Sequence, residues 1–163
     1  MTTEEDVYAA LKYHIELGRN GTRKYYNHAG QLHCEDGPAV VRTGESHWFL
    51  NGRRHRENGP AIEYINGNTE WWLNGVKHRI DGPAVEYHGG KEWWLNGQRH
   101  REDGPAIVHT NGSMEWWQNG KLHREDGPAY ETTYGLKEWF LSGSPYSEAE
   151  YLNILAQRRR NAN

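Results

Sequence analysis

The most informative stretch of the chain is residues 93–106, which read WWLNGQRHREDGPA. Asn-Gly within this stretch is the strongest short signal for a two-residue type I′ hairpin turn. The Asp-Gly-Pro at its end predicts a second turn, because proline cannot donate a hydrogen bond to a neighbouring strand. Alternation along the strand places Trp93 and Leu95 on one face and Glu92 and Trp94 on the other.

The same pattern recurs along most of the chain. A histidine precedes each recurring Gly-Pro by four residues, and in four recurrences a tryptophan precedes that histidine by seven. Each recurrence is called a copy here, and the copies are 22 or 23 residues apart, with their glycines at Gly37, Gly59, Gly82, Gly104 and Gly127. A period of this length is typical of tandem supersecondary units. The sequence therefore predicts a mainly β fold, an elongated antiparallel meander or solenoid of β-hairpin repeats.

Both ends of the chain carry signals for a short helix. A hairpin alone is marginal in water, so an array of hairpins needs a cover at each end. The patterns Thr2-x-x-Glu5 and Ser147-x-x-Glu150 both fit a capping box, and each precedes a stretch with spaced apolar residues. The expected segments are an N-terminal capping helix at residues 1–20, the repeat array at 24–143, and a C-terminal capping helix with a basic tail at 144–163.

The composition fits a thin, aromatic sheet better than a thick aliphatic core. Hydrophobic residues make up 35% of the 163 residues and charged residues 25%, yet the chain has 8 Trp and 10 Tyr. The formal net charge of −3 gives no general attraction to nucleic acid or to an anionic membrane. No apolar stretch is long enough to span a membrane. A single cysteine, Cys34, excludes an internal disulfide, and we expect a reducing, cytoplasmic setting.

The motif W-W-L-N-G-x-x-H-R-x-D-G-P-A resembles a variant of the MORN-like hairpin repeats, in a form seen in uncharacterised proteins of phages and other large DNA viruses. The resemblance covers roughly residues 24–143. It implies a non-enzymatic scaffold that contacts proteins, as MORN-type arrays generally do, and some of those arrays have been linked to membrane lipids. The chain differs from the standard MORN pattern by its His-Arg-Glu-Asp-Gly-Pro-Ala segment.

The recurring His-x-x-Asp pattern has two interpretations. Imidazole with carboxylate suits a metal ligand set or an acid–base pair. Alternatively, the aspartate begins a turn while the histidine packs on a tryptophan or bonds a turn carbonyl. In one copy His55 is followed by Asn58, which preserves turn chemistry and removes the charge. The pattern therefore favours the structural interpretation, and we expect no metal and no cofactor.

Two rows of side chains are candidate binding residues. One repeat position carries arginine in four copies, which predicts either a solvated row of paired charges or a docking strip for an acidic protein, a phosphate or a nucleic acid. The second residue of each Trp-Trp pair faces away from the first, which is expected to pack in the core, and would expose an aromatic row. The candidate binding residues are Arg56, Arg79, Arg101, Arg124, Trp72, Trp94 and Trp117.

These observations predict a non-enzymatic protein that binds another macromolecule. A host protein is the favoured partner, and a viral inhibitor of a host defence is one form of this hypothesis. The alternative is a ligand or nucleic-acid binder, including a nucleotide-sequestering protein, that uses the arginine and tryptophan rows. An enzyme is disfavoured, because one catalytic pair would suffice where the chain has several.

Overall fold

The computed structural model describes residues 12–161, which belong to two units. The first unit ends at His78 and the second begins at Arg79. Both are built mainly of short antiparallel strands, which confirms the predicted mainly β meander. Among the described residues, no helix has the length and apolar character needed to cross a membrane.

The first unit contains a sheet whose described strands are hydrogen-bonded in the order β1-β2-β3-β4-β7-β8. Their bounds are β1 (His14–Leu17), β2 (Arg23–Tyr26), β3 (Val40–Arg42), β4 (Glu45–His47), β7 (Ile62–Tyr64) and β8 (Thr69–Glu70). Two short hairpins lie outside this sheet: β5 (Phe49–Leu50) with β6 (Arg53–Arg54), and β9 (Trp72–Leu73) with β10 (Val76–Lys77).

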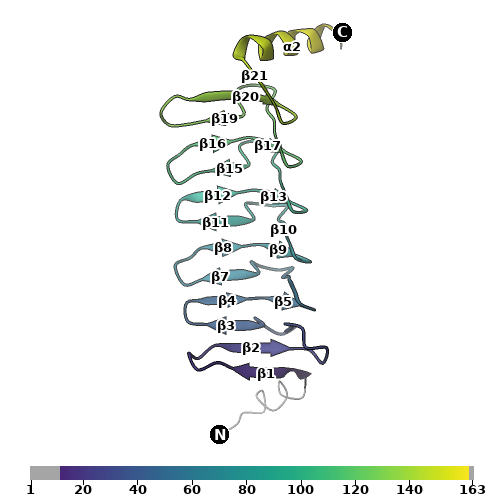
Figure 1. Cartoon of the computed structure of the whole chain (residues 1–163), viewed down its shortest axis with the longest axis vertical. Helices are drawn as coiled ribbons and strands as arrows, with labels where there is room; N and C mark the ends of the chain where they lie inside the picture. The colour runs from purple at the N-terminus through teal and green to yellow at the C-terminus, as the bar shows by residue number, and fades with distance from the viewer. Residues whose placement is uncertain (1–11, 162–163) are drawn as a thin grey trace. The chain divides into compact units, whose positions relative to one another are not determined.

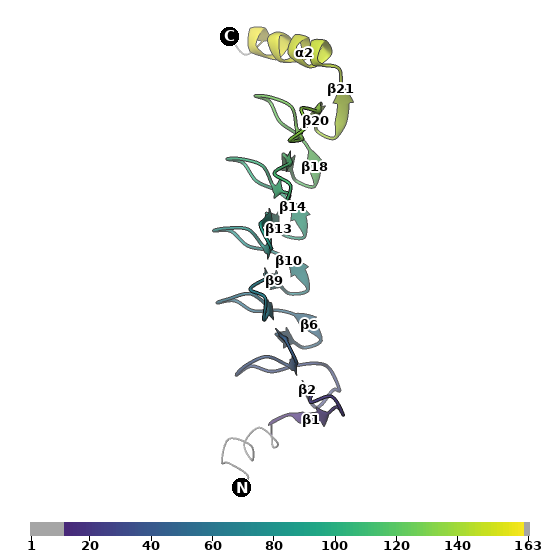
Figure 2. The same ribbon diagram turned by 90° about the vertical axis from the view of Figure 1, so that its left-hand side faces the viewer.

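The second unit repeats this arrangement in the order β11-β12-β15-β16-β19-β20-β21 (Figure 1). The bounds are β11 (Val85–Tyr87), β12 (Gly90–Glu92), β15 (Ile107–Val108), β16 (Met114–Glu115), β19 (Tyr130–Glu131), β20 (Lys137–Leu141) and β21 (Ser144–Tyr146). The short hairpins are β13 (Trp94–Leu95) with β14 (Gln98–Arg99), and β17 (Trp117–Gln118) with β18 (Lys121–Leu122). Figure 2 shows these hairpins projecting from the single layer of the sheet, and helix α2 (Glu148–Asn161) follows β21.

The short hairpins have the predicted type I′ turns. Asn96 and Gly97 both have positive φ, at 50° and 79°, as this turn requires at its two central positions. The Asn-Gly pairs of the other copies share this conformation, and so does Ser142-Gly143. The turns therefore have one backbone conformation, although Ser142 lacks the asparagine side chain that tolerates it best.

The core is narrow and is built around small side chains. The alanine after each Gly-Pro is fully buried, at 0% exposure: Ala39, Ala61, Ala84, Ala106 and Ala129. Ile62, Val85 and Ile107, one residue further on in their copies, are also buried. The first tryptophans, which the sequence assigned to the core, are only half-buried. A thin sheet therefore buries the alanine of every copy and, in three copies, the branched residue beside it.

The predicted N-terminal helix is wrong at its C-terminal end. Residues 14–17 form strand β1, which pairs antiparallel with β2. Glu16 accepts hydrogen bonds from Lys24 and from the Tyr26 hydroxyl on that neighbour. These cross-strand partners and the backbone groups of β2 favour strand over the helical stripe seen in the sequence. Residues 1–11 of the expected helix lie outside the described residues.

The predicted C-terminal helix is confirmed, and its capping box forms as expected. The Ser147 hydroxyl and the Glu150 carboxylate satisfy each other's backbone N–H groups across the first turn. The hydroxyl of Ser147 also donates to Glu150, and this pair lowers the pKa of the carboxyl. Tyr151 is the buried residue of this helix.

Candidate functional site

A loop of five residues ends each copy at its proline and leads into the next strand. We call these segments the Gly-Pro loops. They are residues 34–38, 56–60, 79–83, 101–105 and 124–128. Each one follows the copy's histidine, so the chemistry singled out in the sequence is concentrated here.

At four of the loops, the histidine before the loop joins one copy to the next. The Nδ1 atom of His100 accepts a hydrogen bond of 3.2 Å from the N–H of Asn119, the first central residue of the next hairpin turn. The neighbouring N–H of Gly120 donates to the carbonyl oxygen of Arg99. His33, His55 and His123 make the same Nδ1 contact with Asn51, Asn74 and Ser142. Nδ1 is therefore the hydrogen-bond acceptor of the ring, which leaves Nε2 as the nitrogen that can donate.

The arginine after each histidine turns inward across its own loop. The Arg124 guanidinium lies 3.9 Å from the centroid of the Trp116 ring. Its Nε donates to Asp126 at 2.7 Å, and its Nη1 donates to the carbonyl oxygen of Pro128 and to Glu131. One planar group therefore closes the loop, covers a tryptophan and pairs with two carboxylates.

The other arginines of this row make related contacts. Arg56 and Arg101 stack on Trp48 and Trp93 at 3.9 and 4.0 Å, and Arg79 donates to Asp81 and to the carbonyl oxygen of Pro83. The exposed fractions of the side chains are 30, 20, 24 and 19% for Arg56, Arg79, Arg101 and Arg124. The arginines of this row are therefore paired with neighbouring groups and only partly exposed. Arg79, which Ile80 follows in place of a glutamate, pairs with Asp81 and with Glu86.

Carboxylates, not arginines, point outward from the loops. Glu102 and Asp103 are 86% and 84% exposed, and Asp81 and Asp126 are exposed to a similar extent. The guanidinium of Arg101 holds the pKa of Asp103 below its usual range, and Arg79 does the same for Asp81. Aspartate therefore pairs with the arginine two residues earlier and not with the histidine, so the His-x-x-Asp pair is not formed.

The surface of the second unit is hollowed between successive loops. A hollow of about 690 Å³, the 101–105 hollow, lies between that loop and loop 124–128, with Trp116 and Gln118 in its wall. The 79–83 hollow, of about 780 Å³, lies between loops 79–83 and 101–105. It has Leu95 where the other hollow has Gln118, and Ile80 where the other has Glu102. Two hollows of similar size therefore differ in the polarity of their walls.

The second tryptophans are half-buried on the opposite face from the loop arginines. The Trp94 and Trp117 indole N–H groups donate to Glu92 and Glu115, two residues earlier. The guanidinium of Arg99 lies between these rings, 5.1 and 5.2 Å from their centroids. In the first unit Trp72 has the same glutamate contact and lies beside Arg54. This row thus consists of stacked aromatic rings and arginine side chains, whereas the sequence predicted the aromatic rings alone.

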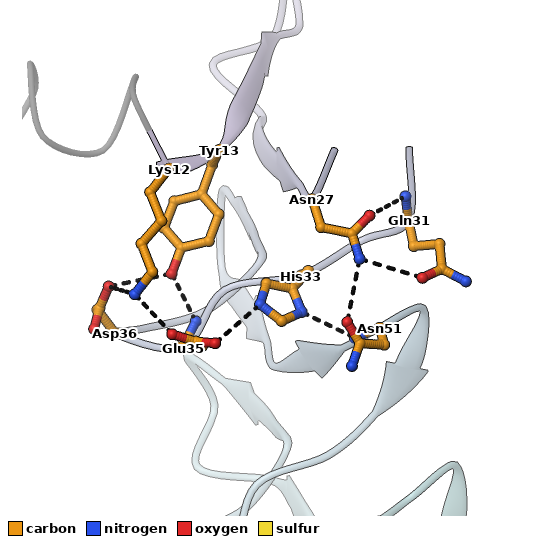
Figure 3. A network of polar contacts seen from close by, with 8 residues as sticks. All are labelled: Lys12, Tyr13, Asn27, Gln31, His33, Glu35, Asp36 and Asn51. Carbon is orange, nitrogen blue, oxygen red and sulfur yellow. Dashed lines mark hydrogen bonds and ion pairs between the residues drawn. The ribbon is translucent and has the colours of Figure 1, made fainter. Parts of the chain in front are cut away.

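The first loop lacks the arginine, and other residues take its place (Figure 3). Cys34 stands at the arginine position, and Lys12 pairs with both Glu35 and Asp36. The Tyr13 hydroxyl donates to Asp36 and accepts from the N–H of Glu35. Lys12 lowers the pKa of both carboxyls. Tyrosine and lysine here supply the hydrogen bond and the cation that arginine supplies elsewhere.

Within residues 12–161, no group of three or more His, Cys, Asp and Glu side chains is arranged to hold a metal ion. No model of a known protein family matches the chain, and comparison with curated proteins gives no match.

Proposed function

We propose that this chain is a non-enzymatic binding protein whose Gly-Pro loops dock a positively charged surface of another protein. One observation carries the proposal: the loop arginines turn inward onto tryptophan and proline, whereas carboxylates such as Glu102 are left in solvent. Charges arranged in this way steer and orient an oppositely charged partner.

The spacing of the loops suits an extended protein contact. Successive copies are two strands apart in the sheet, and neighbouring strands lie about 4.8 Å apart, so equivalent carboxylates recur about every 10 Å. The hollows between loops offer concave places for side chains of the partner. Two neighbouring open hollows lined by charged residues fit a macromolecule better than one small ligand.

The outward carboxylates reverse the charge of the partner expected from the sequence. A docking strip of arginines would attract phosphate or acidic protein, but exposed glutamate and aspartate repel both. The nucleic-acid and nucleotide alternative is therefore the less supported one. A scaffold role also agrees with the resemblance to MORN-like arrays, and a host protein as the partner of a viral protein stays part of this proposal.

The contacts of the loop histidines also favour binding over catalysis. The Nδ1 lone pair of His100 is occupied by a backbone N–H, and Asp103 is paired with Arg101. An acid–base pair needs its two groups within hydrogen-bond reach of each other or of a substrate. Here each group has a structural partner instead.

The test compares capture of proteins by three forms of the immobilised chain. The first is the parent, the second carries Glu102→Gln and Glu125→Gln, and the control carries Glu138→Gln and Glu148→Gln. Both variants remove two exposed carboxylates, so they have the same net charge. We expect proteins held by the parent and the control to be lost from the loop variant, and to be released by salt near about 0.3 M.

Equal capture by all three forms would contradict the proposal, and so would the absence of any captured protein. A labelled single-stranded oligonucleotide is measured in parallel. Saturable binding of the oligonucleotide by the parent would favour the alternative, because exposed carboxylates do not attract a phosphate backbone.

A further inference from the structure

Helix α2 already binds one Gly-Pro loop, and it does so with two side chains. The Tyr151 hydroxyl accepts a hydrogen bond of 3.0 Å from the N–H of Gly127 and donates one of 3.0 Å to the carbonyl oxygen of Arg124. Tyr151 is only 2% exposed, and its burial raises the pKa of its hydroxyl. The backbone of loop 124–128 thus makes two hydrogen bonds with a tyrosine hydroxyl.

The second contact of the helix is made by Arg158. Its Nη1 donates to the outward carboxylate of Glu125 at 2.7 Å. Arg158 follows Tyr151 by seven residues, which is two helical turns, so both side chains project from one face of α2. The tyrosine therefore hydrogen-bonds to the loop backbone, and the arginine pairs with the loop carboxylate.

The first loop of the chain is also bound by a phenol and a cation, although its phenol takes the N–H of the loop glutamate and not that of the loop glycine. Tyr13 accepts a hydrogen bond from the N–H of Glu35, and Lys12 pairs with the carboxylate of the same residue. A phenol oxygen on a loop N–H together with a cation on the loop glutamate therefore occurs at two separate loops. The Gly-Pro loop is suited to this combination.

Loop 101–105 has the same groups, and a hollow lies beside them. Glu102 corresponds to Glu125, and Gly104 corresponds to Gly127. Arg101, Gly104 and Glu102 all line the 101–105 hollow. Over the described part of the chain, the N–H of Gly104 donates no hydrogen bond to another residue.

We propose that the 101–105 hollow binds a helix of a partner protein that carries tyrosine and, seven residues later, arginine. The tyrosine hydroxyl bonds the N–H of Gly104, and the arginine pairs with Glu102. This inference rests on the proposed function and specifies the partner surface as a helix with an aromatic hydroxyl as well as a cation. Helix α2 is the example of such an occupant within the chain, since its own Tyr151 is held by loop 124–128.

The 79–83 hollow supplies a natural contrast. Ile80, which is 85% exposed, stands where Glu102 and Glu125 stand in the other two loops. A helix of this kind could bond the backbone of loop 79–83, but the position that pairs with its arginine holds isoleucine instead of glutamate. The proposal therefore predicts one strong site in the second unit of the parent protein and a second site when Ile80 becomes glutamate.

The experiment measures binding of a labelled peptide with the sequence of residues 147–161 to the full chain by fluorescence anisotropy and calorimetry. We expect saturable binding at low salt. In the peptide, Tyr151→Phe and Arg158→Gln should each weaken binding about tenfold, as loss of a hydrogen bond and of a charge-assisted one does. In the protein, Glu102→Gln should have the same effect as the peptide's arginine change, and Ile80→Glu should raise the number of binding sites by one.

Exchange of the peptide with the chain's own helix is the competing explanation. Exchange would be unaffected by Glu102→Gln and would increase when Tyr151→Phe loosens helix α2 in the protein. Either that result or no binding at about 1 mM peptide overturns the proposal. If the peptide fails while capture still depends on Glu102 and Glu125, only the tyrosine–arginine mode is wrong. If capture of proteins also no longer depends on these carboxylates, the proposed function is wrong as well.

Discussion

At the scale of single residues, the loop arginine and the histidine before it act within the fold. The arginine bonds its own loop, and the histidine holds the next hairpin turn through Nδ1. The sequence predicted a structural role for the histidine, either packing on a tryptophan or bonding a turn carbonyl. The histidine instead accepts a hydrogen bond, because the N–H groups of a type I′ turn point toward the preceding copy and need an acceptor there.

Replacing His100 by leucine is expected to lower the free energy of unfolding by about 1–2 kcal/mol, since the N–H of Asn119 loses its acceptor. His28, which is exposed, is the matched control, and His28→Leu should change stability by less than about 0.5 kcal/mol. Urea unfolding of both variants gives the comparison. Equal effects at the two histidines would remove the proposed role of Nδ1.

The pairing of aspartate with arginine predicts a pH dependence of stability. Arg101 lowers the pKa of Asp103 in the folded chain, so the unfolded chain binds a proton at higher pH than the folded one does. The stabilisation of the folded chain by this ion pair is therefore complete above about pH 4. It is lost as the pH falls through the pKa that Asp103 has in the folded chain. We expect Asp103→Asn to lower the melting temperature at pH 7, and the gap to the parent to narrow below pH 4. A gap that is constant from pH 7 to pH 2 would contradict this pairing.

At the scale of elements, the hairpin turns were predictable and the strand boundaries were not. A type I′ turn needs positive φ at both central positions, so Asn-Gly predicts the turn from two adjacent residues alone. The predicted strand from Glu92 to Leu95 is interrupted at Trp93, where the chain passes from the main sheet to the short hairpin. Strand β1 was missed because its partner, β2, lies later in the chain. The apolar spacing from Val7 to Leu17 resembles a helix until the pairing of Glu16 with Lys24 is known.

The turn conformation makes a prediction at this scale. Asn96→Ala should destabilise the chain by about 1 kcal/mol, because alanine tolerates positive φ poorly. Ser142 has φ of 52° without the asparagine side chain, so Ser142→Asn should stabilise by a few tenths of a kcal/mol. Thermal unfolding of the two variants measures both. A stabilising Asn96→Ala or a destabilising Ser142→Asn would mean that the turn conformation does not limit stability.

At the scale of the whole molecule, the sequence predicted a β meander and a C-terminal helix, but it did not show that the loop arginines turn inward. Arg-x-Asp recurs in the sequence at residues 79–81, 101–103 and 124–126, and it signals an internal pair. An alternating pattern alone cannot indicate whether a long side chain bends back over its own loop. The 30% or lower exposure of these arginines depends on tryptophans and prolines that only folding brings beneath them.

Loop arginines stabilise the fold, whereas the exposed Glu102 contributes little to stability. The most direct test is the unfolding free energy of Arg101→Gln and of Glu102→Gln, two neighbouring residues of one loop. Arg101→Gln should cost about 1–3 kcal/mol, because it removes the stack on Trp93 and the bonds to Asp103 and Pro105. Glu102→Gln should change stability by less than about 0.5 kcal/mol. A neutral Arg101→Gln, or a destabilising Glu102→Gln, would contradict the account.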